Sequence, residues 1–325
     1  MTQLQSHEVL LDLAEAITPL PQTVRELAIA IADRDVPIQV VADIVVTDPG
    51  LTAGLLSEAN SAAAAPVAPV DTVEVAVVQL GMARTLALAT LGALGDLPDE
   101  AYRSYETTAA AAVDHGIVAS RAAEVIAALS TEAVGPEVIT AALLHDLGMV
   151  VLGQVLDASQ LRRAAAELPD LSAAERELVD ADHAEVGALL LDLWRLPSSI
   201  TEPIRYHHRP FDHPTPATLV VSLANLVATI VSPNGVDGHL DAGPGGRGRG
   251  DGPEPCVPAV GHEVARRLGV GIQEVVDRLI EDLRASDLGH LLRPAEELAG
   301  PFGSASDDFS TDATGNRCEE ATDVR

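Results

Sequence analysis

The chain has 325 residues, of which 47% are hydrophobic and only 2% aromatic, so its core must consist mainly of Ala, Leu, Val and Ile. Small and branched side chains of this kind suit close packing of helices. The formal net charge of −29 repels phosphates and anionic headgroups, which argues against direct binding of nucleic acid or of a membrane surface. Protein partners or a metal-held ligand fit this charge better.

Apolar residues recur at helical spacing along most of the chain, and no stretch alternates in the way that a half-buried strand does. The expected fold class is therefore all-α. Asp48, which precedes a proline, predicts the start of one helix, Asp71 is expected to cap another that Gly81 closes, and Asp182 begins an acidic capping box. Gly148 is expected to end a helix. In chain order the expected helices cover about 40–45, 49–60, 73–80, 82–94, 107–129, 136–147, 159–168, 172–180, 183–194, 198–208, 216–231, 259–268 and 272–285.

The composition changes after residue 231. Gly and Pro dominate 232–258, which is typical of a flexible linker. A short helical appendix is expected over 259–290, and the polar, patternless residues 302–325 are expected to form a disordered acidic tail. The apolar stripe of the last helix consists of Val275, Val276, Leu279, Ile280 and Leu283.

Nothing in the sequence predicts a membrane segment. Residues 1–10 show neither the basic nor the long apolar region of a signal peptide. The best apolar stretch, Ala217–Val231, is interrupted by Ser222 and Asn225 and is short for a bilayer span. The expectation is a cytoplasmic protein that binds no membrane.

Five histidines and one aspartate stand on or at the ends of expected helices, in apolar surroundings. Imidazole nitrogens and a carboxylate that converge from several helices can hold a divalent transition metal. A single histidine on a helix is more often a hydrogen-bonded core residue, so the hypothesis depends on the ordered set. That ordinary role is expected for His7, His213, His239, His262 and His290. The candidate metal ligands are His115, His145, Asp146, His183, His207 and His208.

Stretches in both halves of the chain resemble the HDOD (HD-related output domain) family, over roughly residues 18–230. In the first half they are 20–22 (LPQ), 48–61 (DPGLTAGLLSEANS) and 79–84 (QLGMAR). In the second half they are His115, 143–148 (LLHDLG), His183 and 204–210 (IRYHHRP). The long stretch 48–61 is the most specific, because its order and spacing exceed what any helix requires.

The resemblance implies a fold of two helical lobes, an N-terminal lobe over 10–97 and an HD-like helical bundle over 105–231. The wider HD superfamily comprises metal-dependent phosphohydrolases, whose metal activates a water for attack on phosphorus. The six candidate ligands match ligand positions of the HD-GYP branch, which cleaves cyclic di-guanylate.

Three departures from that branch argue against catalysis. Asn225 stands in the helix where an acid is expected, and a neutral amide is a poorer metal ligand. Met149 replaces the basic residue of the HD-x-G-K motif, and residues 209–213 (RPFDH) contain nothing like the GYP segment. No catalytic residue is therefore expected, and any divalent metal is expected to bind weakly or singly.

The leading expectation is a non-catalytic HDOD module that binds other signalling proteins in bacterial signal transduction. One alternative is a metal-dependent phosphohydrolase that acts on a nucleotide. Another is a sensor that binds a nucleotide second messenger through its metal site without cleaving it.

Overall fold

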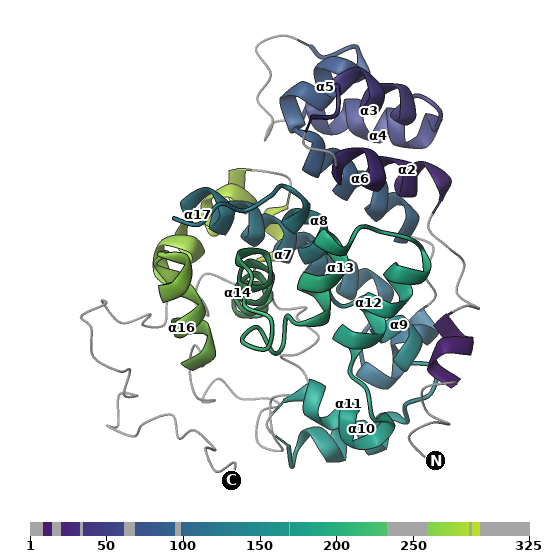
Figure 1. Cartoon of the computed structure of the whole chain (residues 1–325), viewed down its shortest axis with the longest axis vertical. Helices are drawn as coiled ribbons and strands as arrows, with labels where there is room; N and C mark the ends of the chain where they lie inside the picture. Colours follow the sequence, from purple (N-terminus) through teal and green to yellow (C-terminus); the bar gives the residue numbers. More distant parts are fainter. Residues whose placement is uncertain are drawn as a thin grey trace.

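Figure 1 shows a computed structural model of the chain, in which helices are joined by loops. The structure describes residues 9–14, 21–32, 35–61, 69–94, 99–168, 170–232, 259–285 and 288–292. No strand occurs among these residues, so the predicted all-α fold class is confirmed. The expected linker beyond its first residue and the expected tail lie outside the described part of the chain, as do His7 and His239.

Five helices of the first half pack mainly against one another and gather at one end of the molecule (Figure 1). Their buried faces carry Val41, Val45, Leu55, Val73 and Val77. The last of the five also contacts two helices of the second half, α7 (Ala109–Leu129) and α8 (Glu137–Leu144), and so joins the two halves. The five helices are α2 (Gln22–Ala32), α3 (Ile38–Val45), α4 (Pro49–Ala59), α5 (Val73–Leu80) and α6 (Met82–Leu94).

Local sequence signals set the ends of these helices. As predicted, the side chain of Asp48 caps α4 by accepting a hydrogen bond from the backbone N–H three residues on, at 3.0 Å. Gly81 closes α5 with a positive φ of 83°, which favours glycine. The cap predicted at Asp71 is wrong: Thr72 directly precedes the first helical residue, so its hydroxyl, one residue nearer the helix, caps α5.

The second half begins with a 3-10 helix and continues with eight α-helices in the described region. Neither this 3-10 helix nor the short α9 is expected from the sequence. The elements are η1 (Asp99–Tyr105), α7 (Ala109–Leu129), α8 (Glu137–Leu144), α9 (Met149–Leu152), α10 (Ala158–Ala165), α11 (Leu171–Val179), α12 (His183–Leu193), α13 (Ser198–Arg205) and α14 (Pro216–Val231).

Among the predicted helices that end earlier than expected, two matter for the site. The helix predicted over 136–147 ends at Leu144, where backbone bonds from residue i to i−3 replace the α-helical pattern. The helix predicted over 198–208 ends at Arg205. Gly148 does not end a helix; it has helical dihedral angles, φ −62° and ψ −21°, in the turn that leads into α9.

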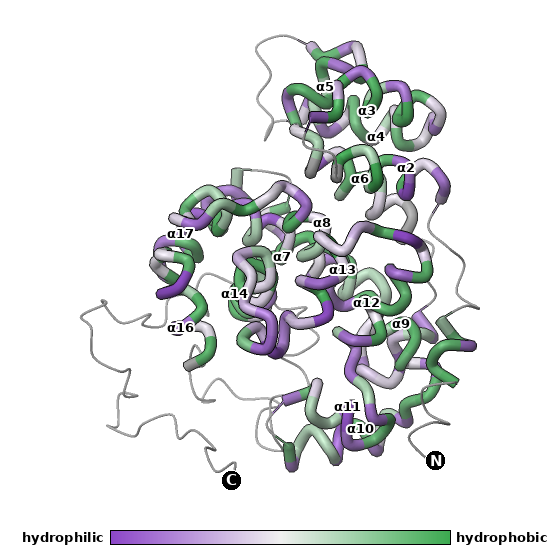
Figure 2. Tube along the Cα trace, in the orientation of Figure 1, coloured by the Kyte–Doolittle hydropathy of each residue, from purple (hydrophilic) through white to green (hydrophobic). Residues whose placement is uncertain are grey.

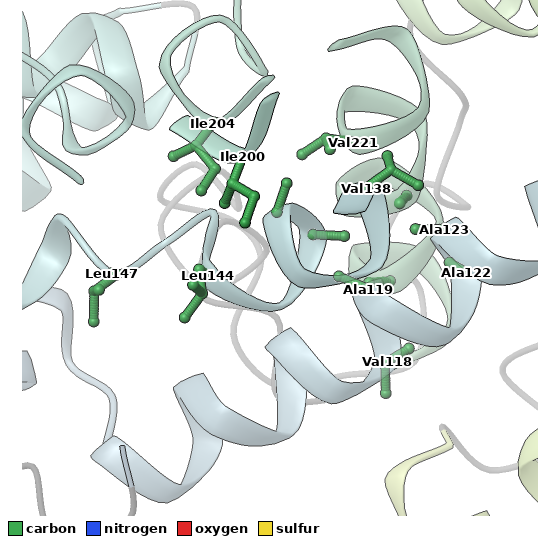
Figure 3. Close-up of a cluster of buried hydrophobic side chains, with 14 of the residues drawn as sticks. Val118, Ala119, Ala122, Ala123, Val138, Leu144, Leu147, Ile200, Ile204 and Val221 are labelled. Carbon is green, nitrogen blue, oxygen red and sulfur yellow. The ribbon is translucent and has the colours of Figure 1, made fainter. Parts of the chain in front are cut away.

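The core of the second half is built around α7, which contacts α8, α14 and α17 (Ile272–Ala285). Ala119, Ala122 and Ala123 are completely buried on this helix. Their small side chains let neighbouring helices approach closely, and branched residues such as Val138 and Val221 fill the space between them (Figure 3). The alanine-rich composition therefore serves helix packing, as the sequence predicts.

Two further helices cover this core. They are α16 (Ala259–Leu268) and α17 (Ile272–Ala285), followed by the 3-10 helix η2 (Gly289–Leu291). The apolar stripe predicted on α17 is confirmed: Val275, Val276, Leu279 and Leu283 are buried, and Ile280 packs partly buried against the core. The mixed hydrophobic and hydrophilic colouring of α17 in Figure 2 reflects this amphipathic pattern.

No single described helix is both long enough and apolar enough to cross a membrane. One pair of helices, Val73–Leu80 with Arg84–Thr90, is long and apolar enough when the two are counted together, although the pair is bent by 109°.

Candidate metal centre

The structure brings all seven predicted residues together, from five different parts of the second half. His115 lies on α7 and Asn225 on α14, whereas His183 is the first residue of α12. The other four lie in turns because the two helices end early. His145 and Asp146 follow α8, and His207 and His208 follow α13.

Asp146 is the centre of the cluster. One carboxylate oxygen, Oδ1, lies 3.0 Å from Nε2 of His145, 3.5 Å from Nε2 of His183 and 4.0 Å from Nε2 of His207. The other, Oδ2, lies 3.7 Å from Nε2 of His115. The four imidazoles are buried, and the aspartate is 7% exposed. Four ring nitrogens therefore face one carboxylate in a site almost sealed from water.

Backbone contacts orient two of these rings. Nδ1 of His145 lies 2.7 Å from the carbonyl oxygen of Ala142, and Nδ1 of His207 lies 2.6 Å from that of Ile204. A carbonyl oxygen can only accept, so each Nδ1 carries a proton, and in the neutral ring Nε2 presents a lone pair. This is the arrangement that metal-binding histidines need.

The remaining two imidazole contacts concern His208 and Asn225. Nε2 of His208 lies 2.8 Å from Nε2 of His183, and this ring is half-buried. Oδ1 of Asn225 lies 3.0 Å from Nε2 of His115. The amide therefore stands beside an imidazole of the cluster, at the place where the resemblance implies an acid.

Burial and mutual charge determine the protonation of the cluster. Burial alone would raise the pKa of Asp146, but the imidazoles of His145, His115 and His183 outweigh it and hold the pKa well below its usual value. Burial, reinforced by neighbouring imidazoles, lowers the pKa values of His207 and His208 well below 6.5. Asp146 is therefore ionised, and His207 and His208 are neutral near pH 7, which is the charge state that metal ligands need.

The donor set fits a divalent metal ion. Oδ2 of Asp146 and Nε2 of His207 are both buried, and neither makes a hydrogen bond with the described residues. Buried polar atoms normally have partners, and a cation would provide one here. Two groups have ligand atoms that all lie within 4.8 Å of one another: His115 with His145 and Asp146, and His183 with His207 and His208.

Three buried residues near the cluster escape prediction from the sequence. Glu175, on α11, is completely buried and contacts His183 at 2.8 Å. Tyr105 and Tyr102 come from η1, and burial, together with the carboxylate of Asp146, raises the pKa of Tyr102. One signal could have revealed Glu175: it follows Leu171 by four residues, on the helix face where an apolar residue is expected.

Comparison with known proteins agrees with the resemblance to the HDOD family. The model of the HDOD domain matches residues 17–210. A structure titled as an HDOD domain protein with unknown function, from Geobacter sulfurreducens, is 24% identical, with a TM-score of 0.59 over 87% of this chain and 99% of that one. None of the curated proteins matches this chain.

Two other solved structures have the same fold at lower identity. A protein from Shewanella amazonensis, provisionally named a phosphohydrolase, is 20% identical, with a TM-score of 0.55 over 90% of this chain and 98% of that one. A protein from Marinobacter aquaeolei, provisionally named a signal transduction protein, is 21% identical, with a TM-score of 0.58 over 89% of this chain and 65% of that one. At these identities the likeness concerns the fold.

The all-α fold is shared with these structures. The family match covers more than half of the chain, so this chain belongs to the HDOD family.

Proposed function

We propose that this chain is a non-catalytic HDOD signalling module that holds a single divalent metal ion in the cluster around Asp146. Its partners are signalling proteins, and its strongly negative net charge of −29 disfavours nucleic acid. The observation that supports this proposal most strongly is the composition of the cluster, in which several imidazoles surround one carboxylate.

One carboxylate supports one ion better than two. Two divalent ions in a shared site repel each other, and bridging carboxylates reduce that repulsion. Only Asp146 provides such a group in the proposed ligand set, because Asn225 contributes an uncharged amide beside His115. The proposed ligands are therefore Asp146 and the four imidazoles that face it, with His208 adjacent to His183.

Within the described residues, the basic groups beside the cluster are already paired with carboxylates. Met149 is completely buried at the position that the resemblance assigns to a basic residue. Arg209, which follows the histidine pair, forms ion pairs with Glu185 and Asp212. Arg176 forms an ion pair with Asp182. Phosphoryl transfer depends on such positive groups, so their absence or neutralisation supports a non-catalytic role.

A metal-dependent phosphohydrolase is the second candidate function. It is favoured by the two three-residue groups, which together offer ligands for two ions. A bound divalent ion would supply Lewis acidity toward a phosphate oxygen. A nucleotide sensor would use the same residues for binding alone.

An assay of turnover and binding separates the three functions. The full chain is incubated with cyclic di-guanylate and Mn²⁺, hydrolysis is followed by chromatography, and binding by calorimetry. We expect neither turnover nor tight binding. Binding without turnover identifies a sensor. Efficient hydrolysis that Asp146→Ala abolishes, and that His213→Ala, at a half-buried histidine outside the cluster, retains, would establish the enzyme.

A further inference from the structure

One face of α11 holds the start of α12, where His183 lies. Ser172 and Arg176 both contact the carboxylate of Asp182: the serine hydroxyl donates to Oδ2 at 3.0 Å, and the guanidinium forms an ion pair with it. The other oxygen, Oδ1, accepts from the backbone N–H of Glu185 at 2.8 Å and so caps α12. Both residues of α11 therefore fix the position of the helix that begins with His183.

Glu175 lies on the same face of α11, between these two contacts. Its Oε2 accepts a hydrogen bond from the backbone N–H of His183 at 2.9 Å and lies 2.8 Å from Nδ1 of the same residue. Its Oε1 accepts from the hydroxyl of Tyr105 at 2.7 Å. Glu175 and the ring of His183 are completely buried, so water does not compete for these contacts.

We infer that Glu175 and Tyr105 are positioning residues of the metal centre, an inference that rests on the proposed function. A carboxylate that already accepts from the backbone N–H also accepts from Nδ1, so this nitrogen carries the proton. Nε2 of His183 then presents its lone pair to the site, 3.5 Å from Oδ1 of Asp146. Tyr105 fixes Oε1, which keeps Oε2 on His183.

His183 differs in this respect from the other oriented rings. His145 and His207 are held by neutral carbonyl oxygens three residues earlier in the chain. A carboxylate partner makes an imidazole a stronger electron donor toward a cation. His183 should therefore be the strongest neutral ligand of the cluster, and its strength should depend on two residues from outside it, one on α11 and one on η1.

A purely structural role makes a different prediction. If Glu175 only joined α11 to α12, its replacement by glutamine would cost stability but leave the tautomer of His183 unchanged. A glutamine in place of Glu175 can donate to Nδ1 through its amide nitrogen, which moves the ring proton to Nε2. The ring would then present a proton to the metal position.

The test uses the full chain labelled with ¹⁵N-histidine. Long-range ¹H–¹⁵N spectra report the tautomer of His183 without metal, and calorimetry with Co²⁺ alone reports metal affinity. The wild type should show Nδ1–H. Glu175→Gln should shift the ring to Nε2–H and weaken Co²⁺ binding about 10- to 100-fold. Tyr105→Phe should weaken binding less than tenfold and keep the Nδ1–H tautomer.

Glu177→Gln is the matched control, because Glu177 is exposed on the same helix. It should change neither the tautomer nor the affinity. The inference is overturned if wild-type His183 carries its proton on Nε2, or if folded Glu175→Gln keeps both the wild-type tautomer and affinity. If Glu175→Gln does not fold, the tautomer of His183 in the wild type and the Co²⁺ affinity of Tyr105→Phe still test the inference. A wild type with Nδ1–H that binds no Co²⁺ would contradict the proposed metal site and leave the ring positioning standing.

Discussion

Gly148 is the position where a single methyl group should damage the site most. The residue has ordinary helical dihedral angles, so left-handed geometry does not explain the glycine. A Cβ atom at Gly148 would lie 1.9 Å from the carbonyl oxygen of His183 and 2.5 Å from the backbone nitrogen of Gly187. Both atoms belong to α12, which therefore passes directly against the turn that carries Asp146.

The size of the effect follows from these distances. Real Cβ atoms essentially never approach another heavy atom closer than 3.0 Å, so in Gly148→Ala the turn and α12 must separate by roughly 1 Å. The obstacle is backbone, which cannot rotate away as a side chain does. Overpacking usually costs about 1–3 kcal/mol, and we expect the upper end of this range or more. His183 would move from Asp146, and metal affinity should fall more than tenfold.

Urea unfolding and Co²⁺ calorimetry measure the two effects. Gly54→Ala is the matched control, because an added Cβ at Gly54, inside α4, meets nothing within 4 Å. This change should raise the free energy of unfolding by about 0.4–1 kcal/mol and leave metal affinity unchanged. A Gly148→Ala protein with the wild-type unfolding free energy and Co²⁺ affinity would refute the reasoning.

Three further predictions concern pH, charge and the connection between the helices. The depressed pKa values of His207 and His208 mean that the unfolded chain binds more protons than the folded one below about pH 6.5. Their contribution to the free energy of unfolding is therefore complete above that pH and falls as the pH drops, by up to about 1.4 kcal/mol per pH unit for each group. A free energy of unfolding in urea that stays constant from pH 7.5 to 5.5 would contradict this. Asn225→Asp should tighten Co²⁺ binding, measured by calorimetry, without creating phosphodiesterase activity; weaker binding would count against a metal beside His115. Arg121→Ala should lower the free energy of unfolding by about 1–2 kcal/mol, because this 8% exposed arginine lies within 4.0 Å of carboxylates on α4, α7 and α17; a loss below about 0.3 kcal/mol in urea would show that the network is unimportant.

Much of the fold follows from local signals in the sequence. Pro216–Val231 and Ala259–Leu268 begin and end as predicted, because apolar periodicity and capping residues act within a few residues of one another. The last residues of α8 and α13 do not follow from such signals. Their final turns tighten because His145 and His207 turn back to bond carbonyl oxygens of their own helices, which depends on the assembled site.

The site, too, has some features that the sequence predicts and others that depend on tertiary packing. The residue types around Asp146 and their order are visible in the sequence, and the structure brings them within a few ångströms. Glu175 and Tyr105 are not visible as a pair, because they lie 70 residues apart and meet only through tertiary packing. Their separation explains why periodicity, which reports one helix at a time, cannot link them to His183.

The most direct test of the account is the metal stoichiometry of the full chain. The protein, freed of metal by a chelator, is titrated with Co²⁺ by calorimetry, in parallel with Asp146→Asn, which keeps the shape of the side chain and removes its charge. The account predicts one ion per chain for the wild type and at least tenfold weaker binding for the variant. Binding of two ions per chain, or equal affinity in both proteins, would contradict it, and so would a wild type that binds no ion.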